Sequence, residues 1–305
     1  PPRSTLFPYT TLFRSLKDTI ATRLMVIITS GAVLFFVAIG LVLLVKGLPV
    51  IKSHSLTELL TTSNWKPMKG QFGFLTFIVS TLLVTLLALI LSFPLALLSS
   101  IYLSEFSSQR IKKFFMPVID LLSGIPPVIY GVWGTLTLVP FIADTLAPHF
   151  VDFSTGYSLL AGGIVLAVMI LPLMISIFLE VMESTPQDLR EASLSLGATR
   201  WETTTKVVLK RSTSGILAGV VLAISRAFGE TIAVMMVCGN FTAMPKSLFD
   251  ACYPLPALIA NNYGEMMSMP DYESALMLAG FILFVIIIVF NTVSWFILKR
   301  IKRSL

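Results

Sequence analysis

The sequence predicts an all-α membrane protein with about six transmembrane helices and both termini in the cytoplasm. Hydrophobic residues make up 55% of the 305 residues and charged residues only 12%, about half the charged share of a soluble protein. The apolar residues gather in long uncharged blocks, and roughly 18 or more such residues in a row are typical of a membrane-spanning helix. Lysines and arginines fall mostly between alternate blocks, which sets the orientation.

The first span is expected at 24–45, after an N-terminal tail of residues 1–23. As a helix, its 22 residues would cover roughly 33 Å, enough for a bilayer core. Residues 1–15 repeat Thr-Leu-Phe between prolines and lack the charged and apolar regions of a signal peptide. We therefore expect residues 1–15 to be an artefact that lies outside the fold.

The uncharged run 70–104 contains the second span but is too long for one upright helix. We expect 72–77 to lie along the membrane interface and Pro94 to kink the remainder. The third span is expected over 114–142, with an interruption at Gly-Ile-Pro-Pro, residues 124–127.

The later spans are expected at 157–179, 212–238 and 274–298. Together with the second and third spans they form a transmembrane core over 72–298, followed by a basic cytoplasmic tail, 299–305.

The basic residues orient these spans. Of 22 lysines and arginines, 16 fall at the two ends or in the loops after spans two and four, five fall in the other loops, and Arg226 lies within a span. Positive charge marks cytoplasmic loops, so the termini and the 183–211 loop are predicted to be cytoplasmic. The net charge of +6 is explained by anchoring at the lipid bilayer, and we expect no nucleic-acid partner.

Cysteine and histidine give no metal-ligand pattern. Cys238 and Cys252 lie in or near one outer loop, where a disulfide or two unpaired thiols would both fit. His54 and His149 lie in separate loops without neighbouring carboxylates or thiols. We expect no metal site.

The 183–211 loop carries the signals of a short helix at 186–197. Thr185 is placed to cap it, with Pro186 at the first position and Asp188 at the third. Gly197 supplies a left-handed residue to end it. An amphipathic linker helix on the membrane surface would show the same signals.

Arg226 and Glu230 lie near the middle of the fifth span. Each charge costs about 2.5–3.5 kcal/mol at this depth, and such charges usually mark a transport path. The i, i+4 spacing also allows a self-neutralising pair, although arginine before glutamate is the less favourable order. Gly229, with the hydroxyls of Ser225 and Thr231, completes a face that suits an oxyanion. In this interpretation Arg226 binds the anion, while Glu230 positions Arg226 and limits retention.

The break at Gly124, Pro126 and Pro127 has two interpretations. Unwound backbone at membrane depth is tolerated inside protein or beside water, and the following half-helix would then aim its positive end at an anion. A simple proline kink fits equally. Asp120, one turn earlier, would face either a subunit interface or the cytoplasmic mouth.

Two resemblances to known families indicate which function is expected. Glu191-Ala192-Ser193, then Gly197, then Val207-x-Leu209, resembles the Glu-Ala-Ala signature of ABC-importer permeases, although Ser193 replaces the third residue and Lys210 replaces a proline. The resemblance implies that this helix couples to a separate ATPase, with Glu191 as a polar contact, Ala192 and Ser193 as packing residues and Gly197 as the turn.

The segments RAFGET, residues 226–231, and SGIPPVIYGVWG, residues 123–134, resemble the PstC-type permeases of phosphate-specific ABC importers. This similarity implies the MetI-like architecture, a prokaryotic inner-membrane location and phosphate as substrate. It also implies three partners: a second, PstA-like permease, a PstB-like ATPase dimer and an extracytoplasmic, PstS-like phosphate-binding protein, for which the outer loop 239–273 is a candidate docking surface.

The chain has no phosphate-binding GxxxxGK[ST] loop. We therefore expect a non-catalytic subunit without a bound cofactor, with ATP and magnesium on the partner ATPase. Three other interpretations remain: a permease for another tetrahedral oxyanion, a proton-coupled secondary transporter that uses Glu230, and a non-transporting scaffold. The last two leave the Glu-Ala-Ala signature or the charges in mid-membrane unexplained.

Overall fold

The computed structural model describes residues 8–264 and 269–304, and the side chains of 17–264 and 269–300. Within these residues six helical stretches are long and apolar enough to cross a membrane, which confirms the predicted multi-pass membrane protein. They are Lys17–Ser53, Leu75–Phe106, Pro127–His149, Leu159–Glu183, Arg200–Phe228 and Pro270–Arg300.

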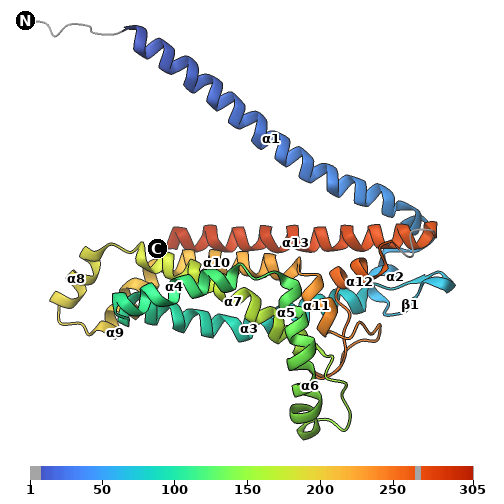
Figure 1. The fold of residues 1–305 in the computed structure, drawn as a ribbon. Coiled ribbons are helices and arrows are strands. Elements are labelled where there is room, and N and C mark those ends of the chain that lie inside the picture. Colours follow the sequence, from blue (N-terminus) through green and yellow to red (C-terminus); the bar gives the residue numbers. More distant parts are fainter. Residues whose placement is uncertain (1–7, 265–268, 305) are drawn as a thin grey trace, which may run out of the picture.

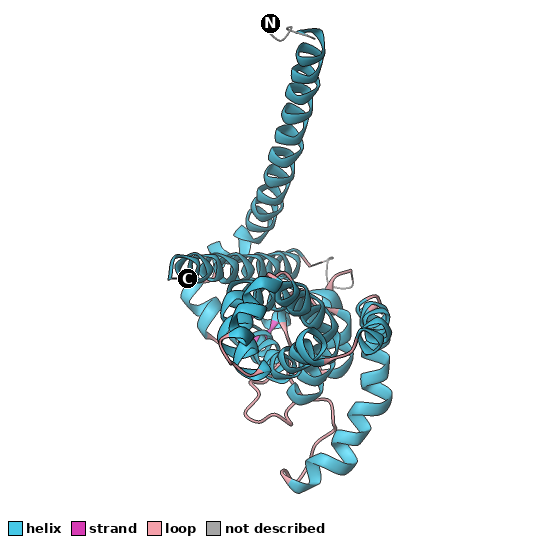
Figure 2. Cartoon of the chain, turned by 90° about the vertical axis from the view of Figure 1, so that its left-hand side faces the viewer, coloured by secondary structure: helices cyan, strands magenta, loops and turns pink. Residues whose placement is uncertain are grey.

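Long helices lie side by side in the body of the protein, and short elements cover both ends (Figure 1). The long ones are α3 (Leu75–Ile101), α7 (Leu159–Glu183), α10 (Leu209–Phe228) and α13 (Pro270–Ser304). One end carries α8 (Gln187–Ser195) and α9 (Arg200–Thr203). The other end carries α2 (Leu56–Thr61), α12 (Leu255–Asn262) and an antiparallel hairpin of β1 (Trp65–Lys66) and β2 (Gln71–Phe72). Figure 2 shows how small this hairpin is beside the helices.

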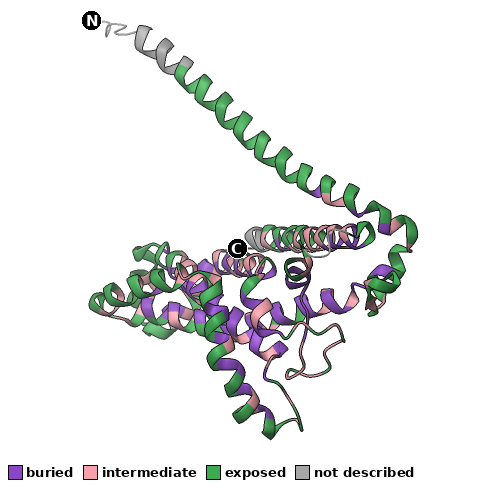
Figure 3. Ribbon diagram, turned by 45° about the vertical axis from the view of Figure 1, so that its right-hand side comes forward, coloured by how far each residue is buried: buried purple, intermediate pink, exposed green. Residues whose placement is uncertain are grey.

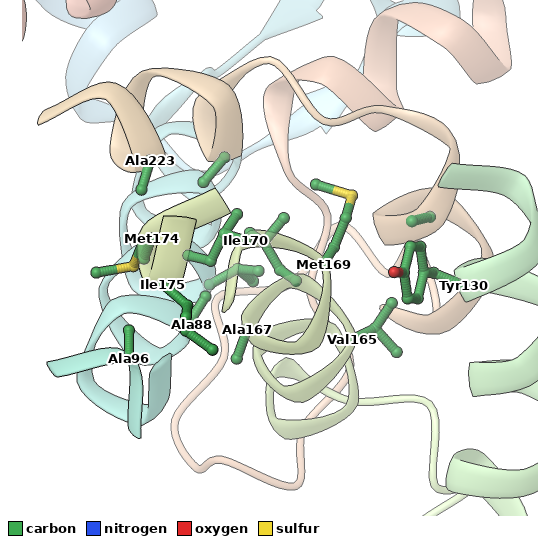
Figure 4. Close-up of a cluster of buried hydrophobic side chains, with 14 of the residues drawn as sticks. Ala88, Ala96, Tyr130, Val165, Ala167, Met169, Ile170, Met174, Ile175 and Ala223 are labelled. Carbon is green, nitrogen blue, oxygen red and sulfur yellow. The ribbon is translucent and has the colours of Figure 1, made fainter. Parts of the chain in front are cut away.

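The core is centred on α7, which is covered by α3, α5 (Pro127–Trp133) and α10 (Figure 4). Small residues let α3 and α7 approach closely. A Cβ at Gly163 would lie 2.5 Å from Leu87 Cδ2, and the Ser100 hydroxyl donates a 3.2 Å hydrogen bond to the Ile175 carbonyl. Such close packing replaces the hydrophobic effect, which is weak between helices in lipid.

Helix α1 (Pro8–Ser53) is longer than the predicted span of 24–45 and includes residues 8–23 of the expected tail. Residues 1–7 lie outside the described residues. The second half of α1 packs on α13, where the Phe36 and Phe284 rings stand 4.7 Å apart. The first half diverges from the body (Figure 1), and residues 17–39 are exposed (Figure 3). At the other terminus α13 continues helically through the basic tail to Ser304.

Residues 72–77, which we expect along the membrane interface, are mostly buried within the protein. Phe74 and Phe77 are fully buried and pack on Trp65, with ring centroids 5.5 Å and 5.1 Å away. The hairpin and α12 cover this end of α3, so its aromatic residues join a second small core. Helix α3 also continues through Pro94 without interruption.

The third span begins later than predicted. Residues 109–123 form a separate helix, α4 (Gln109–Ser123). Its residues Ile111 and Met116 pack on the core, whereas Arg110 and Lys113 are exposed. The chain then breaks at Gly124–Pro126, as the sequence indicates. The span itself comprises α5, a π-helical turn (Gly134–Leu138), α6 (Val139–Phe141), a second π-helical turn (Ile142–Leu146) and a short 3₁₀ turn (Ala147–His149).

The fifth span is not the single helix predicted over 212–238. A helix runs from Arg200 through a π-helical turn (Thr204–Val208) to the end of α10 at Phe228. After Gly229–Thr231 the chain resumes as α11 (Ile232–Val237). The apolar pattern continues across this break, so periodicity alone could not reveal it.

Half-helices α5 and α11 pack directly on each other. The Thr135 hydroxyl, just beyond α5, donates to the Met236 carbonyl at 3.1 Å. A Cβ at Gly131 would lie 2.6 Å from Met236 Sδ and 3.2 Å from Ala233 Cα. Because both half-helices start at a break, this contact places the two breaks side by side.

We expect Gly131→Val to separate α5 from α11, because the backbone at Ala233 leaves no room for a larger side chain. Overpacking of this kind costs about 1–3 kcal/mol, so the melting temperature of the purified protein should fall. Gly31→Val on α1 is the matched control, since a Cβ there meets nothing within 4 Å. Equal melting temperatures for the two variants would contradict the packing described.

Candidate functional site

The first break leaves a carbonyl that the protein itself satisfies. Pro126 has no N–H to donate to the Leu122 carbonyl, the bond that a continuous helix would make. The Tyr130 hydroxyl donates to that carbonyl at 2.7 Å instead, and the Ile125 N–H reaches it at 3.3 Å. The unwound turn is therefore held in a defined shape, which favours a built break over a simple proline kink.

The second break is stabilised by Glu230. Its carboxylate accepts a 3.1 Å hydrogen bond from the Ala233 N–H, so it caps the first turn of α11, where donors are free and negative charge is favoured. Gly229 ends α10, and a Cβ there would meet only the Arg226 and Ser225 carbonyls, at 3.7 and 4.0 Å. The space beside this glycine is therefore open.

Arg226 lies in the last turn of α10 and is half-buried. No carboxylate of the described side chains lies within ion-pair distance of it. The structure therefore does not form the anticipated Arg226–Glu230 pair, because the helix ends at Gly229 and Glu230 turns toward α11. Arg226 lies within electrostatic range of Tyr130 in α5. An unpaired cation thus stands beside both breaks.

The two predicted hydroxyls have different surroundings. Ser225 donates to Asn291 Oδ1 in α13 at 2.9 Å, whereas the Thr231 hydroxyl bonds locally to the Gly229 carbonyl at 3.2 Å. Sequence reasoning missed Asn291 and Tyr130. The signal for Asn291 was a lone amide in an apolar span, since polar groups there seek partners on other helices.

Glu230 also faces the outer end of α3. A cavity of about 10 Å³ lies between Glu230, Thr81, Thr85 and the start of α12, close to the room that one water needs. The Thr81 hydroxyl accepts the Leu255 N–H at 2.8 Å. Glu230, α3 and the start of α12 therefore meet at one small cavity.

A large cavity opens outside, beyond α11. It measures about 810 Å³ and lies between residues 153–157, residues 239–251 and the end of α11. Asp250 accepts hydrogen bonds from the Lys246 and Ser247 backbone N–H groups. The Lys246 bond is the main reason that the pKa of Asp250 is lowered. Leu160 and Leu159 donate to the Leu248 and Asp250 carbonyls at 2.8 and 2.9 Å, so the loop is firmly held.

Cys238 and Cys252 are fully buried free thiols at the base of this loop. The Cys252 N–H donates to the Cys238 carbonyl at 2.8 Å. The cysteines join the loop to the end of α11 through their backbones.

The predicted cytoplasmic helix forms as α8, and none of its residues is buried. Leu189 and Leu194 are more than 40% exposed, and Leu196 is 90% exposed. Glu191 and Ala192 face solvent, while the Ser193 hydroxyl lies 2.9 Å from that of Thr203. Gly197 has φ +84°, which confirms the left-handed turn.

The expected cap at Thr185 is wrong. Thr185 is buried and its hydroxyl faces Ser212 at 3.4 Å, while Pro186 occupies the cap position. A full capping box forms instead at Thr199 and Glu202, at the start of α9. Burial of Thr185 against α10 prevents its hydroxyl from reaching the first turn of α8.

Comparisons with known proteins agree with this geometry. A family model described as binding-protein-dependent transport system inner membrane component matches residues 92–305. The probable ABC transporter permease protein YqgH of Bacillus subtilis is 40% identical over 87% of this chain and 86% of its own. The phosphate transport system permease protein PstC of Xylella fastidiosa is 32% identical over 99% and 98%.

A solved bacterial alginate ABC transporter, crystallised with its periplasmic protein, shares the fold. It has a TM-score of 0.65 at 16% identity and covers 93% of this chain and 97% of the matched chain. This likeness confirms the architecture that the sequence resemblance implied.

The end of α8 depends on the left-handed backbone of Gly197. Gly197→Val should destabilise the end of α8 by about 1–2 kcal/mol, because a branched residue fits a left-handed backbone poorly. Gly197→Asn should be tolerated, since asparagine adopts this conformation more readily. Hydrogen exchange of the α8 amides would measure the difference. Equal exchange in the two variants would show that backbone strain at this position does not control α8.

Proposed function

The chain belongs to the family of binding-protein-dependent transport system inner membrane components, and we propose that it is the permease subunit of an ATP-driven importer that carries inorganic phosphate into the cytoplasm. The observation that carries this proposal is Arg226, a cation beside two helix breaks that has no carboxylate partner among the side chains that the structure describes. Relatives named as phosphate permeases match nearly the whole chain.

The chemistry of Arg226 suits a phosphate oxyanion. A guanidinium keeps its charge when water is removed and offers a fork of donors that matches two phosphate oxygens. At membrane depth an unpaired charge is costly, so an arriving anion relieves part of that cost. The partial positive charge at the start of α5 would add attraction on the same side.

Glu230 limits how tightly the anion is held. Its negative charge lies four residues from Arg226 and is fixed to the first turn of α11. If Arg226 and Glu230 were fully paired, no site would remain for the anion. If Arg226 stood without a nearby carboxylate, it would release the anion slowly. Transport requires binding that is weak enough to reverse.

The exposed surfaces at the two ends of the molecule suggest the partners that would bind there. The exposed leucines of α8, with Glu191, would dock on an ATPase dimer that binds ATP and magnesium, so this chain needs no cofactor of its own. The 810 Å³ outer cavity would face an extracytoplasmic phosphate-binding protein. A second, PstA-like permease would cover the open space beside Gly229 and Arg226.

The decisive experiment is uptake of labelled phosphate by the reconstituted complex, with and without ATP and the binding protein. We expect uptake only when both are present. Competition by arsenate or sulfate reveals whether other tetrahedral oxyanions are carried. Uptake driven by a proton gradient without ATP would instead support a secondary transporter.

Arg226→Gln should lower phosphate uptake by about a hundredfold, the lower end of the loss seen when an enzyme loses one hydrogen-bond donor to an oxyanion. Assembly should persist because Arg226 makes no described ion pair. Arg211→Gln is the matched control, since Arg211 lies on the same helix but is exposed near its cytoplasmic end. Normal uptake by the Arg226→Gln complex would refute the role of Arg226.

Glu191→Lys should release the ATPase subunit, because the reversed charge lies on the exposed face of α8. The amount of ATPase that co-purifies with the permease measures this. Glu58→Lys, exposed on α2 at the opposite end, should leave co-purification unchanged. If Glu191→Lys retains the ATPase as well as the control does, α8 does not dock through this residue.

A further inference from the structure

Arg190, the residue before the Glu-Ala-Ala signature, makes an unusually complete set of contacts. Its Nη2 and Nε donate to the two Glu105 carboxylate oxygens at 2.9 and 3.2 Å. It also donates to the Met182 carbonyl at 2.9 Å and to the Thr185 carbonyl. The side chains of Arg190 and Glu105 are only 13% and 10% exposed. Four bonds therefore fix one arginine of an otherwise exposed helix.

These contacts join three elements. Glu105 lies in a π-helical turn (Tyr102–Phe106) that continues α3. Met182 and Thr185 lie at the end of α7 and just beyond it, where carbonyls lack helical partners. Arg190 thus ties α8 to the cytoplasmic ends of both α3 and α7, across a polar cavity of about 380 Å³.

The opposite end of α3 touches the Glu230 region. The Thr81 hydroxyl accepts the Leu255 N–H at 2.8 Å, and Ser80 accepts the Tyr253 N–H at 3.4 Å. Thr81 and Thr85 line the small cavity that Glu230 faces. Helix α3 has 27 residues and is roughly 40 Å long, so it links the base of α8 to the small cavity that Glu230 lines.

We propose that the Glu105–Arg190 pair is the positioning contact through which movement of α8 reaches α3, and through α3 the Glu230 region. This inference rests on the proposed function, in which a separate ATPase moves α8. Arg190 and Glu105 act through other residues and touch no substrate.

The physical character of the pair supports a transmitting role. A largely buried ion pair is weak evidence for stability, because apolar residues of similar volume are often as stable, whereas its fixed geometry specifies one arrangement. A bidentate arginine fork resists both sliding and rotation. The π-helical turn that holds Glu105 is of a kind often found at functional sites.

A neighbouring pair provides the control. Lys112 of α4 and Glu183 at the end of α7 form an ion pair at the edge of the same cavity. Their side chains are 24% and 39% exposed. Lys112 and Glu183 join α4 to α7, and neither forms an ion pair with a residue of α8. Loss of this pair should therefore leave the coupling between α8 and α3 unchanged.

The experiment compares reconstituted complexes that contain the wild-type chain, Glu105→Gln, Glu105→Asp or Glu183→Gln. It measures ATPase co-purification, ATP hydrolysis stimulated by the binding protein, and phosphate taken up per ATP hydrolysed. Glu105→Gln should lower this last ratio by about tenfold, a size typical of lost coupling between contacting residues. Glu105→Asp, which keeps the charge but shortens the reach, should give an intermediate ratio. Glu183→Gln should match the wild type.

A structural role alone would lower yield, hydrolysis and uptake together and leave their ratio unchanged. If Glu105→Gln does not assemble, the ratio in Glu105→Asp decides: a lowered ratio supports the proposal, and an unchanged one overturns it. An equal fall in Glu183→Gln would also overturn it. Absence of phosphate uptake by the wild-type complex refutes the proposed function instead, whereas normal wild-type uptake with an unchanged Glu105→Gln ratio refutes only the coupling role.

Discussion

A backbone polar group within hydrocarbon must find its partner inside the protein, because no water is present to replace it. At each break in the interrupted helices, one side chain gives a backbone group a partner. Tyr130 donates to the Leu122 carbonyl that Pro126 leaves unpaired, and Glu230 accepts from the free Ala233 N–H of α11. The breaks are therefore stable parts of the fold. Because their half-helices α5 and α11 pack together, Arg226 has irregular backbone close by.

The distribution of charged residues also distinguishes Arg226. The ion pairs of the described side chains lie near the two ends: Lys46–Glu273 outside, and Lys112–Glu183, Arg190–Glu105 and Lys206–Glu202 in the cytoplasm. Within the membrane, Glu230 caps α11, and Arg226 has no carboxylate among the described side chains within ion-pair distance. Stability does not explain Arg226, since an apolar side chain would avoid the cost. A ligand or a partner subunit explains it better.

Local signals predicted much of this architecture, and contacts distant in sequence account for most of the rest. The six spans, the break at 124–127 and the left-handed turn at Gly197 follow from composition, proline and glycine. The break after Gly229 does not, because glycine is tolerated within a helix and the apolar pattern continues beyond it. The cap at Thr185 fails because burial against α10 overrides a local preference. The Glu105–Arg190 pair joins residues 85 positions apart, and no local pattern shows such a pairing.

Mobility is expected to be unequal across this fold. Helices α3 and α7 pack through small residues over most of their length and are joined by hydrogen bonds such as Ser100 to Ile175, so they should behave as one rigid unit. The half-helix α11 has only six residues, and a helix this short depends on its packing for stability. A force applied at α8 would therefore move the rigid pair as a body, and the change of shape would concentrate at the two breaks. Arg226 and Glu230 lie at this junction. In the proposed function, a small rotation of α11 would change the distance between their charges and hence the affinity for an anion.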